Sequence, residues 1–298
     1  MADNSNETIP LPSVAMLGMG TMGTGMAHRL LSHNANLTIY ARKPEKRQEF
    51  ERAGASTADS PSKAVANADI VITIVSDDAA SREVWLGPNG ALSGVRADSV
   101  SLESSTISPD WALELGRHFA EKGRDFLDAP VTGSKPQAAA GELTFLVGGK
   151  AEALRKAEPV LRILGRKVAH LGPLGSGARM KLINNMLCAV QAAGLAEALT
   201  LAEKSGLAMD SVLDLLTNGA PGSPMVKTLS KRMIDRNYDV NFYLHLMAKD
   251  VAYAIDLSKS LGASHEAADV ALDLLKKAGE KGWSDKDFSS LIEPLRTQ

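Results

Sequence analysis

Short apolar runs, many of them β-branched, alternate with amphipathic stretches between Ser13 and about His170. This alternation is the pattern of βαβ units around a mostly parallel sheet. The runs expected to form strands are Val14–Leu17, Leu37–Tyr40, Ile70–Val75, Ser99–Glu103, Asp125–Asp128, Leu143–Val147 and Lys167–His170. Residues that favour helix starts follow two of them, at Ser76-Asp77-Asp78 and at Ser108-Pro109-Asp110. The pattern predicts an open α/β domain in the first part of the chain.

The pattern changes after Gly175-Ser176-Gly177, where strand-like runs cease. Apolar residues from Ala178 to Leu207 recur at helical spacing, and a helix of about 27 residues would be about 40 Å long. Shorter helices are expected at about Met209–Asn218, Ser223–Arg236, Phe242–Leu261, Ser264–Lys281 and Ser284–Leu295. We therefore predict a short disordered lead over residues 1–12, an α/β domain over 13–174 and an all-helical domain over 175–298, joined by the long helix.

Composition narrows the possible partners. The 298 residues carry 33 Lys and Arg against 35 Asp and Glu, a net charge of −2, so the concentrated basic excess of a nucleic-acid binder is absent. The single cysteine, Cys188, excludes an internal disulfide and a thiolate metal cluster and fits a reducing, cytoplasmic compartment. The histidines show no metal-ligand spacing, so we expect no metal site.

No sequence feature predicts a membrane or export segment. No run approaches the roughly 18 apolar residues of a membrane-spanning helix. The first twelve residues contain Asp3 and Glu7 but no Lys or Arg, so they resemble neither a signal nor a transit peptide. We expect a soluble protein.

The segment Gly18-Met19-Gly20-Thr21-Met22-Gly23 directly follows the first predicted strand and precedes helical spacing. A GxGxxG sequence alone is a weak signal, but strand, motif and helix in this order form the dinucleotide fingerprint of a Rossmann domain. Gly18 permits the tight turn, Gly20 lets the backbone approach a pyrophosphate, and Gly23 allows close packing of helix on strand. The alternative is a glycine-rich turn that only packs.

Arg42 and Lys43 follow the second predicted strand, where an NAD-selective domain usually has an acidic residue for the ribose hydroxyls. Two cations at this place suit a 2′-phosphate, since Arg offers bidentate charge-assisted hydrogen bonds. We therefore predict NADP as the cofactor. The alternative is a solvated charge pair at a helix start.

Four further segments extend this picture. They are Ser104-Ser105-Thr106, the run from Asp128 through Ala129-Pro130-Val131-Thr132-Gly133-Ser134 to Lys135, the run from Gly175 to Asn185, and Lys249-Asp250. Together with the glycine turn they cover nearly the whole chain, and in this order they resemble the β-hydroxyacid dehydrogenase family. Within the family, the segment Gly133-Ser134-Lys135-Pro136, the Arg42 position and the stretch from Gly219-Ala220 to Pro224-Met225 look most like the NADPH-dependent glyoxylate and succinic semialdehyde reductases. The 3-hydroxyisobutyrate dehydrogenases typically have a second glycine where Ser134 stands.

The resemblance implies that Lys181 is the catalytic proton donor. Hydride transfer to a carbonyl needs such a donor at the developing alkoxide, and an ammonium also stabilises that oxyanion. We expect burial to lower the Lys181 pKa. Asn185 lies four residues on and shares a helix face with Lys181, so we expect it to hydrogen-bond the lysine or the substrate oxygen. The alternative is a surface lysine at a helix start.

The loop from Pro130 to Gly141 follows a strand, at the end where open α/β sheets bind ligands. By resemblance it binds the substrate carboxylate, with the Thr132 hydroxyl and the backbone N–H groups of Gly133 and Ser134. The family usually has Ser in place of Thr132, so the additional methyl group bears on substrate preference. Read without the family, the segment is a Pro/Gly turn.

The remaining candidates rest on the resemblance alone. It places Thr106 beside the nicotinamide and substrate, and Val75, Ser76 and Asp77 near the adenosine half; helix capping is an equal alternative for both loops. It places Lys249 near the cofactor and Asp250 in the substrate pocket, with Phe242 as an apolar wall. Without it, Lys249-Asp250 is a solvated helix pair.

These features predict NADPH-dependent reduction of small carboxylate-bearing aldehydes to hydroxyacids. The alternative with the same groups is oxidation of 3-hydroxyisobutyrate or a related β-hydroxyacid. An imine reductase generally lacks the lysine, and a non-catalytic cofactor-binding protein would not need it. The long apolar helix and the helices after it expose more apolar surface than one small domain covers, so we predict a homodimer or homotetramer through the helical domain.

Overall fold

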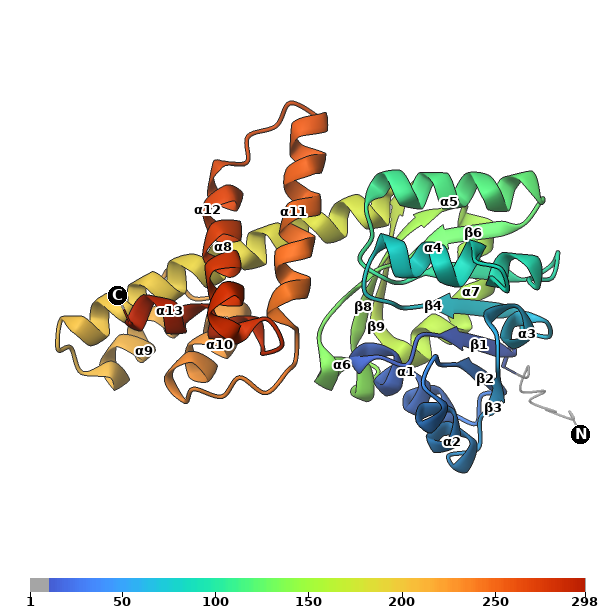
Figure 1. Ribbon diagram of the computed structural model, residues 1–298, viewed down its shortest axis with the longest axis horizontal. Helices are drawn as coiled ribbons and strands as arrows, with labels where there is room; N and C mark the ends of the chain where they lie inside the picture. Colours follow the sequence, from blue (N-terminus) through green and yellow to red (C-terminus); the bar gives the residue numbers. More distant parts are fainter. Residues whose placement is uncertain (1–10, 298) are drawn as a thin grey trace, which may run out of the picture. The chain divides into compact units, whose positions relative to one another are not determined.

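The computed structural model describes residues 11–297, so the first ten residues of the predicted disordered lead lie outside the described part. The chain forms two compact units. The first comprises Met1–Thr106 and Asp110–Ala178, and the second comprises Ile107–Pro109 and Arg179–Gln298. Figure 1 labels the elements of both units.

The first unit is built on a nine-stranded sheet of order β3-β2-β1-β4-β5-β6-β8-β7, with β9 paired to β8. Its strands are β1 Val14–Leu17, β2 Leu37–Tyr40, β3 Ser56–Ala58, β4 Ile70–Thr73, β5 Val100–Glu103, β6 Asp125–Asp128, β7 Val131–Thr132, β8 Leu143–Gly149 and β9 Gly165–Gly172. The first six pair in parallel, whereas β8 runs antiparallel to β6 and β7. The strand order reverses at β1, which lies between β2 and β4, and ligands bind at such switch points in open α/β sheets.

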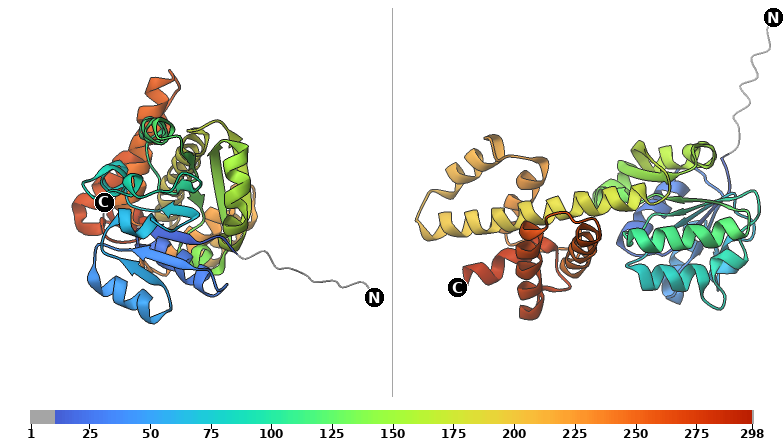
Figure 2. Two further views of the ribbon diagram at one scale, coloured as in Figure 1. Left: turned by 90° about the vertical axis from the view of Figure 1, so that its right-hand side faces the viewer. Right: turned by 90° about the horizontal axis from the view of Figure 1, so that it is seen from above.

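Helices cover both faces of this sheet (Figures 1 and 2). They are α1 Thr21–Leu31, α2 Pro44–Arg52, α3 Pro61–Val65, α4 Asp78–Leu86, α5 Pro109–Glu121, α6 Lys135–Ala140 and α7 Ala151–Leu164. The apolar faces of α1 and α7 share one buried cluster with the sheet, which includes Met26, Leu161, Met16 and Ile72. On α4 and α5, Trp85 and Phe119 pack edge to face with ring centroids 5.2 Å apart. This is the predicted doubly wound Rossmann architecture, and the fold-class prediction is confirmed.

The second unit consists of helices joined by loops, and its described residues form no strand beyond an isolated β-bridge between Tyr243 and Asp287. Its helices are α8 Ser176–Lys204, α9 Met209–Asn218, α10 Pro224–Ile234, α11 Leu244–Ser260, α12 Glu266–Ala278 and α13 Glu293–Arg296, and α8 starts within the first unit. Its core gathers apolar residues of α8, α10, α11 and α12, among them Leu199, Met233, Val251 and Leu275. The α8 helix is long and apolar enough to cross a membrane, but half of its most apolar stretch is buried inside the protein. In this structure α8 is therefore a core helix.

One predicted helix is wrong. Instead of a helix over Ser284–Leu295, the chain forms a 3₁₀ helix at Phe288–Ile292 followed by the short α13. The Asp287 side chain accepts the Ser289 N–H and hydroxyl, which stabilises the tighter 3₁₀ start. Two strands, β3 and β7, were not predicted, because three and two residues are too few to show a periodicity.

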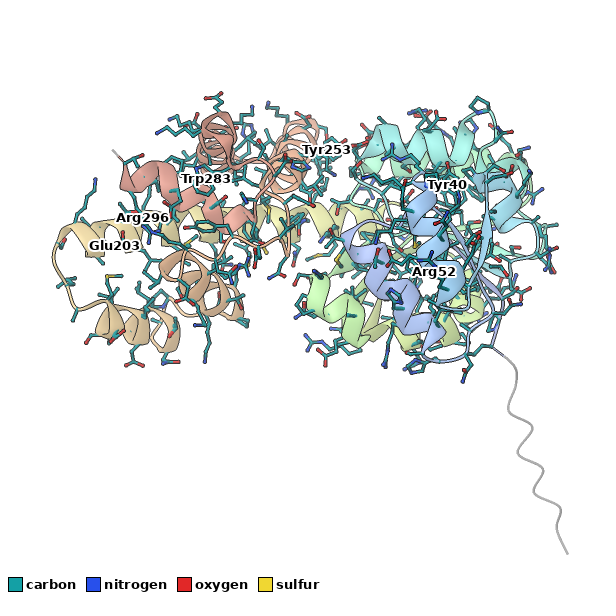
Figure 3. The ribbon with its side chains drawn as sticks, turned by 60° about the horizontal axis from the view of Figure 1, so that its bottom comes forward. Tyr40, Arg52, Glu203, Tyr253, Trp283 and Arg296 are labelled. Carbon is teal, nitrogen blue, oxygen red and sulfur yellow. The ribbon has the colours of Figure 1, made fainter. Side chains whose placement is uncertain are left out.

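Arg296 fastens the C-terminal helix to α8. Its side chain is 9% exposed and binds both carboxylate oxygens of Glu203 at 2.9 and 2.5 Å. Both residues are labelled in Figure 3. It also donates to the Met233 carbonyl and to Glu293. These charge-assisted bonds raise the pKa of the Arg296 guanidinium.

Candidate cofactor and catalytic sites

The glycine turn lies between β1 and α1, at the carboxyl end of the central strand. Gly18 has a φ of +106°, and a Cβ there would come within 2.2 Å of the Ile74 carbonyl oxygen. A Cβ on Gly23 would lie 2.0 Å from the Gly18 carbonyl oxygen. Only glycine fits either position, and the consequence is a tight turn packed directly on the loop after β4.

Gly20 is the N-cap of α1 and has no side chain to cap the first turn. A Cβ placed on it would meet nothing within 4 Å, so space is open beside the free N–H groups of the helix start. Such a helix start favours an anion, and the residues present therefore fit a dinucleotide pyrophosphate. Thr21 opens α1, while the Met19 side chain is buried and Met22 packs on the core. The two methionines are thus available to a cofactor mainly through their backbone.

Arg42 and Lys43 are exposed after β2, and Lys43 is the N-cap of α2. Arg47, on the first turns of α2, donates to the Ala41 carbonyl at 2.7 Å and so braces this loop. The structure therefore leaves the Arg42 and Lys43 side chains open to solvent beside the carboxyl end of β2, the position at which a ribose 2′-substituent is read in this fold.

The loops after β4 and β5 are joined to each other. The Val75 N–H donates to the Ser105 hydroxyl at 2.7 Å. Asp77 caps α4, since its carboxylate accepts the Ala80 N–H at 2.8 Å and the Ser76 hydroxyl at 2.8 Å. The helix-capping interpretation therefore holds for Asp77, and the predicted cofactor contacts of this loop and of Thr106 stay predictions.

The predicted carboxylate loop begins at β7 and runs into α6. Gly133 has a φ of +120°. Ser134 forms a capping box with Gln137, whose side-chain oxygen accepts both the Ser134 N–H at 2.9 Å and its hydroxyl at 2.8 Å. Those Ser134 donors are engaged in this structure, so Thr132 and the Gly133 backbone remain the more accessible candidates for a substrate carboxylate.

Asp128 begins the run from Asp128 to Lys135, and the sequence pattern indicates no role for it. It is fully buried at the end of β6 and accepts the N–H groups of Gly175 and Ala178 at 2.8 and 2.7 Å. A Cβ on Gly177 would lie 2.9 Å from its carboxylate. Asp128 thus caps the first turn of α8, and burial raises its pKa to about 6 against the effect of these bonds.

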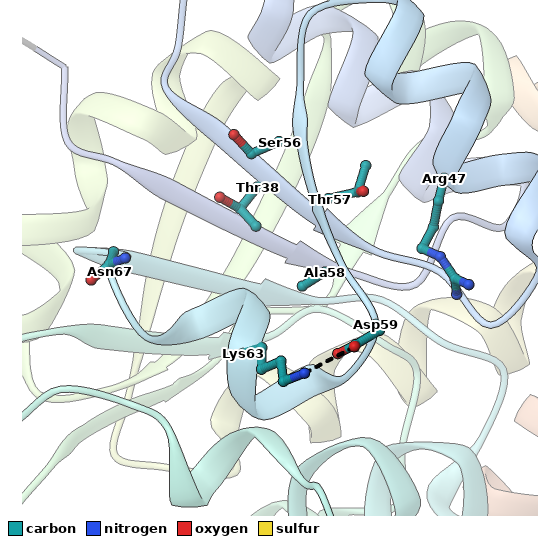
Figure 4. A pocket seen from close by; sticks show the side chains of 8 residues that line it. All are labelled: Thr38, Arg47, Ser56, Thr57, Ala58, Asp59, Lys63 and Asn67. Atoms are coloured by element: carbon teal, nitrogen blue, oxygen red, sulfur yellow. Dashed lines mark hydrogen bonds and ion pairs between the residues drawn. The ribbon is translucent and has the colours of Figure 1, made fainter.

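A surface hollow of about 540 Å³ lies over β2 and β3, between α2 and α3 (Figure 4). Its lining includes Arg47, Thr57 and the ion pair of Lys63 with Asp59. None of the predicted cofactor or substrate residues lines it. The hollow is therefore separate from the candidate cofactor and substrate sites.

In the second unit, Lys181 lies on α8 and is 8% exposed. Burial lowers its pKa, and the nearby Asp250 carboxylate acts in the opposite direction. A surface lysine is thus excluded, and Lys181 is instead a buried amine whose pKa is lowered, the direction that a general acid needs.

Asn185 and Asp250 form the polar surroundings of this lysine. The Asn185 amide nitrogen donates to Oδ2 of Asp250 at 2.6 Å, and its oxygen accepts from Asn184 at 2.9 Å. Lys249 forms an ion pair with Oδ1 of Asp250 at 2.9 Å. The Asn185 amide thus donates to Asp250 and not to Lys181. Lys249 and Asp250 are not a solvated pair, because Asp250 is 1% exposed.

Phe242 and Cys188, also in this unit, have apolar or weakly polar side chains. Phe242 is partly buried and packs edge to face on Phe288, with ring centroids 5.8 Å apart. Cys188 is also partly buried, and burial raises its thiol pKa. A protonated, shielded thiol does not make a nucleophile.

Comparison with protein-family models divides the chain at the same point as the change in sequence pattern. Residues 13–172 match the NAD-binding domain of 6-phosphogluconate dehydrogenase. Residues 175–295 match the model described as NAD-binding of NADP-dependent 3-hydroxyisobutyrate dehydrogenase.

Full-length relatives show the same likeness. A glyoxylate/succinic semialdehyde reductase 2 of Arabidopsis thaliana is 34% identical, over 95% of this chain and 79% of its own length. A mitochondrial 3-hydroxyisobutyrate dehydrogenase of Rattus norvegicus is 35% identical, over 96% and 87%. Among solved structures, the 3-hydroxyisobutyrate dehydrogenase of Mycobacterium tuberculosis with L-serine is 32% identical, covers 96% of this chain and 99% of its own, and superposes with a TM-score of 0.87.

Proposed function

Because the chain belongs to the β-hydroxyacid dehydrogenase family, and is therefore a nicotinamide-dependent oxidoreductase, we propose that it reduces small carboxylate-bearing aldehydes with NADPH. Glyoxylate and succinic semialdehyde are the substrates that we expect. The observation that carries the proposal is the buried Lys181 ammonium, whose surroundings contain the Asn185-bonded carboxylate of Asp250.

Lys181 supplies the acid chemistry. When bound, a reduced nicotinamide would supply the hydride that the aldehyde carbon accepts. The carbonyl oxygen gains negative charge as this happens, and the Lys181 ammonium stabilises that charge and transfers one proton to it. The product is the alcohol, and Lys181 is left neutral until it takes a proton from solvent.

Asp250 keeps the lysine charged before the reaction. Burial alone favours the neutral amine, which has no proton to give to an alkoxide. The Asp250 carboxylate opposes this, and Asn185 and Lys249 fix its two oxygens. Asn185 is thus argued to act through Asp250, as a positioning residue.

The preference for NADPH is supported by charge. Arg42 and Lys43 are exposed at the carboxyl end of β2 with no carboxylate at that point of the sequence, and a guanidinium binds a phosphate through two parallel hydrogen bonds. The Arabidopsis relative, a reductase of aldehyde acids by its name, is 34% identical.

Oxidation of a β-hydroxyacid is the second candidate. It uses the same groups in reverse, with neutral Lys181 accepting the alcohol proton. The rat and mycobacterial 3-hydroxyisobutyrate dehydrogenases favour it, since they are similar over nearly the whole chain.

We also propose that the second unit pairs with another copy of this chain. Leu187 and Leu201 on α8 and Leu215 on α9 are 56%, 68% and 69% exposed. The α9 helix has no fully buried residue although one face is apolar. Exposed apolar faces of this kind are typical of subunit interfaces.

One assay separates these candidates. Initial rates are measured with NADPH and NADH against glyoxylate, succinic semialdehyde and methylmalonate semialdehyde, and with NADP⁺ and NAD⁺ against 3-hydroxyisobutyrate. The proposal expects the highest kcat/KM with NADPH and one of the first two aldehydes. A higher kcat/KM for 3-hydroxyisobutyrate would favour the second candidate, and NADPH binding without turnover of any substrate would contradict both.

A further inference from the structure

Glu103 is a buried carboxylate that the reaction above does not use. It is the last residue of β5 and is fully buried. Burial raises its pKa, while hydrogen bonds from Ser105, Ser81 and Trp85 act in the opposite direction. Among the described residues no cation forms an ion pair with Glu103, and its hydrogen-bond donors are neutral.

Its two oxygens face two different parts of the fold. Oε2 accepts the Ser81 hydroxyl at 2.5 Å and the Trp85 indole N–H at 2.9 Å, both from α4. Ser81 in turn accepts the Trp111 indole N–H at 2.9 Å. Oε1 accepts the Ser105 backbone N–H at 2.9 Å, from the loop after β5.

Ser105 connects Glu103 to the loop after β4. The Ser105 hydroxyl accepts the Val75 N–H at 2.7 Å, which fixes the loop after β4. That loop lies against the glycine turn, because a Cβ on Gly18 would be 2.2 Å from the Ile74 carbonyl oxygen and 3.0 Å from a Val75 methyl. Glu103, Ser105, Val75 and Gly18 therefore form one continuous contact path.

We propose that Glu103 is a positioning residue for the nicotinamide cofactor, acting through Ser105 and Val75 on the wall of the glycine turn. The inference rests on the proposed function only in that a nicotinamide cofactor binds at this turn. A small shift of Val75 would alter the space at Gly18, where no side chain separates the two segments.

The alternative is a buried hydrogen-bond hub that only stabilises the fold. The two roles predict different effects of Ser81 and Ser105 on cofactor binding. A stabilising hub would lower Tm alone, whether the substitution removes the Ser81 hydroxyl that donates to Glu103 or the Ser105 hydroxyl that accepts the Val75 N–H. A positioning residue would pass its effect to the cofactor through Ser105 alone.

The test compares Glu103→Gln, Ser105→Ala and Ser81→Ala by the Kd for NADPH, measured from its fluorescence, and by Tm. Gln keeps the shape but presents an amide NH₂ to a donor, which leaves one hydrogen bond unmade. Glu103→Gln and Ser105→Ala are each expected to raise the Kd about tenfold, the equivalent of about one hydrogen bond. Ser81→Ala is expected to lower Tm while the Kd stays within twofold.

A double variant identifies the path. If Glu103 acts on the cofactor through Ser105, the combined Glu103→Gln and Ser105→Ala variant raises the Kd no more than the larger single change, because both substitutions interrupt the same path from Glu103 to Val75. Equal effects of Ser81→Ala and Ser105→Ala on Kd, or multiplication of the two single effects, would overturn the inference. Should Glu103→Gln not fold, the comparison of Ser105→Ala with Ser81→Ala still decides it.

This outcome is separable from that of the proposed function. Failure of the wild-type protein to reduce any aldehyde while it binds NADPH would reject the proposed substrates and leave the Kd comparison in force. Unchanged Kd values in the variants of a protein that turns over would reject the inference alone. A wild-type protein that binds neither NADPH nor NADH would reject both.

Discussion

The side-chain nitrogen of Asn185 lies 2.6 Å from Oδ2 of Asp250, and both residues are buried in the second unit. Helical spacing alone placed Asn185 beside Lys181, but its amide is donated to a carboxylate 65 residues further along the chain. Asp250 therefore acts electrostatically on Lys181, the proposed proton donor, and Asn185 hydrogen-bonds that carboxylate.

Replacing Asp250 by Asn is expected to shift the pH dependence of aldehyde reduction. Asp250 raises the Lys181 pKa against burial, so its removal lowers that pKa further. The protonated lysine is the donor, and the rate therefore falls at a lower pH in the variant. Above the pH at which the variant loses this proton, and below that at which the wild-type protein loses it, we expect kcat to be up to about a hundredfold lower in the variant, the contribution of a general acid. The measurement is kcat against pH.

Asp256→Asn is the matched control, because Asp256 lies exposed on the same helix. Its profile should superimpose on that of the wild-type protein. An unchanged alkaline limb in Asp250→Asn would show that Asp250 does not act on Lys181.

Arg42→Asp is expected to remove the preference for NADPH. The substitution exchanges a bidentate phosphate donor for a group that repels phosphate and can bind ribose hydroxyls. A charge-assisted hydrogen bond contributes about 1.5–3 kcal/mol, so kcat/KM with NADPH should fall about 10- to 100-fold while that with NADH does not. Arg52→Asp, at the other end of α2, should leave both unchanged (Figure 3). Equal NADPH preference in Arg42→Asp and the wild-type protein would reject NADP as the cofactor.

Asp128 is expected to make stability depend on pH in an identifiable window. Its pKa is raised from 3.8 to about 6 in the folded state, so the folded protein holds the proton more tightly. The contribution of Asp128 to the free energy of unfolding is fully present at low pH. It is lost as the pH rises from about 4 to about 6, a total of about 3 kcal/mol. The measurement is the free energy of unfolding of the wild-type protein minus that of Asp128→Asn, against pH.

Asp125→Asn, on the same strand, controls for an amide substitution near the surface. The wild-type advantage over Asp128→Asn should shrink across that window, and the difference from Asp125→Asn should show no such step. A difference that is independent of pH would mean that folding does not raise the pKa of Asp128.

The second unit is expected to self-associate through its exposed leucines. Light scattering should give the wild-type protein at least twice the mass of one 31.5 kDa chain. Leu201→Glu combined with Leu215→Glu buries two charges in the proposed interface and should yield monomers, whereas Lys204→Glu should not. A monomeric wild-type protein would contradict the proposal.

Local pattern predicted most of the fold. β1 and β2 were placed to the residue because their buried and half-buried positions follow the sheet directly. β3 was missed because Ser56-Thr57-Ala58 has no apolar alternation, and only its pairing with β2 makes it a strand. The C-terminal segment was misjudged because Asp287 and Pro294 divide it into two short helices.

The site was predictable where its chemistry is local in sequence. The glycine turn and Lys181 follow from short motifs. The Asn185 partner of Asp250 is 65 residues away, and the Gly175 and Ala178 partners of Asp128 are 47 and 50 residues away. Glu103, on β5, takes its Ser81 partner from α4, 22 residues earlier. A charged residue ending a buried strand was the available signal for Asp128 and Glu103, since such a group must find donors.

The central claim is that Lys181 donates the proton, and Lys181→Ala tests it most directly. The measurement is kcat for aldehyde reduction at saturating NADPH, together with the Kd for NADPH, and exposed Lys204→Ala on the same helix is the control. The account predicts a loss of at least about a hundredfold in kcat with Kd within twofold of the wild-type value. A loss of less than about tenfold, with NADPH still bound, would contradict it.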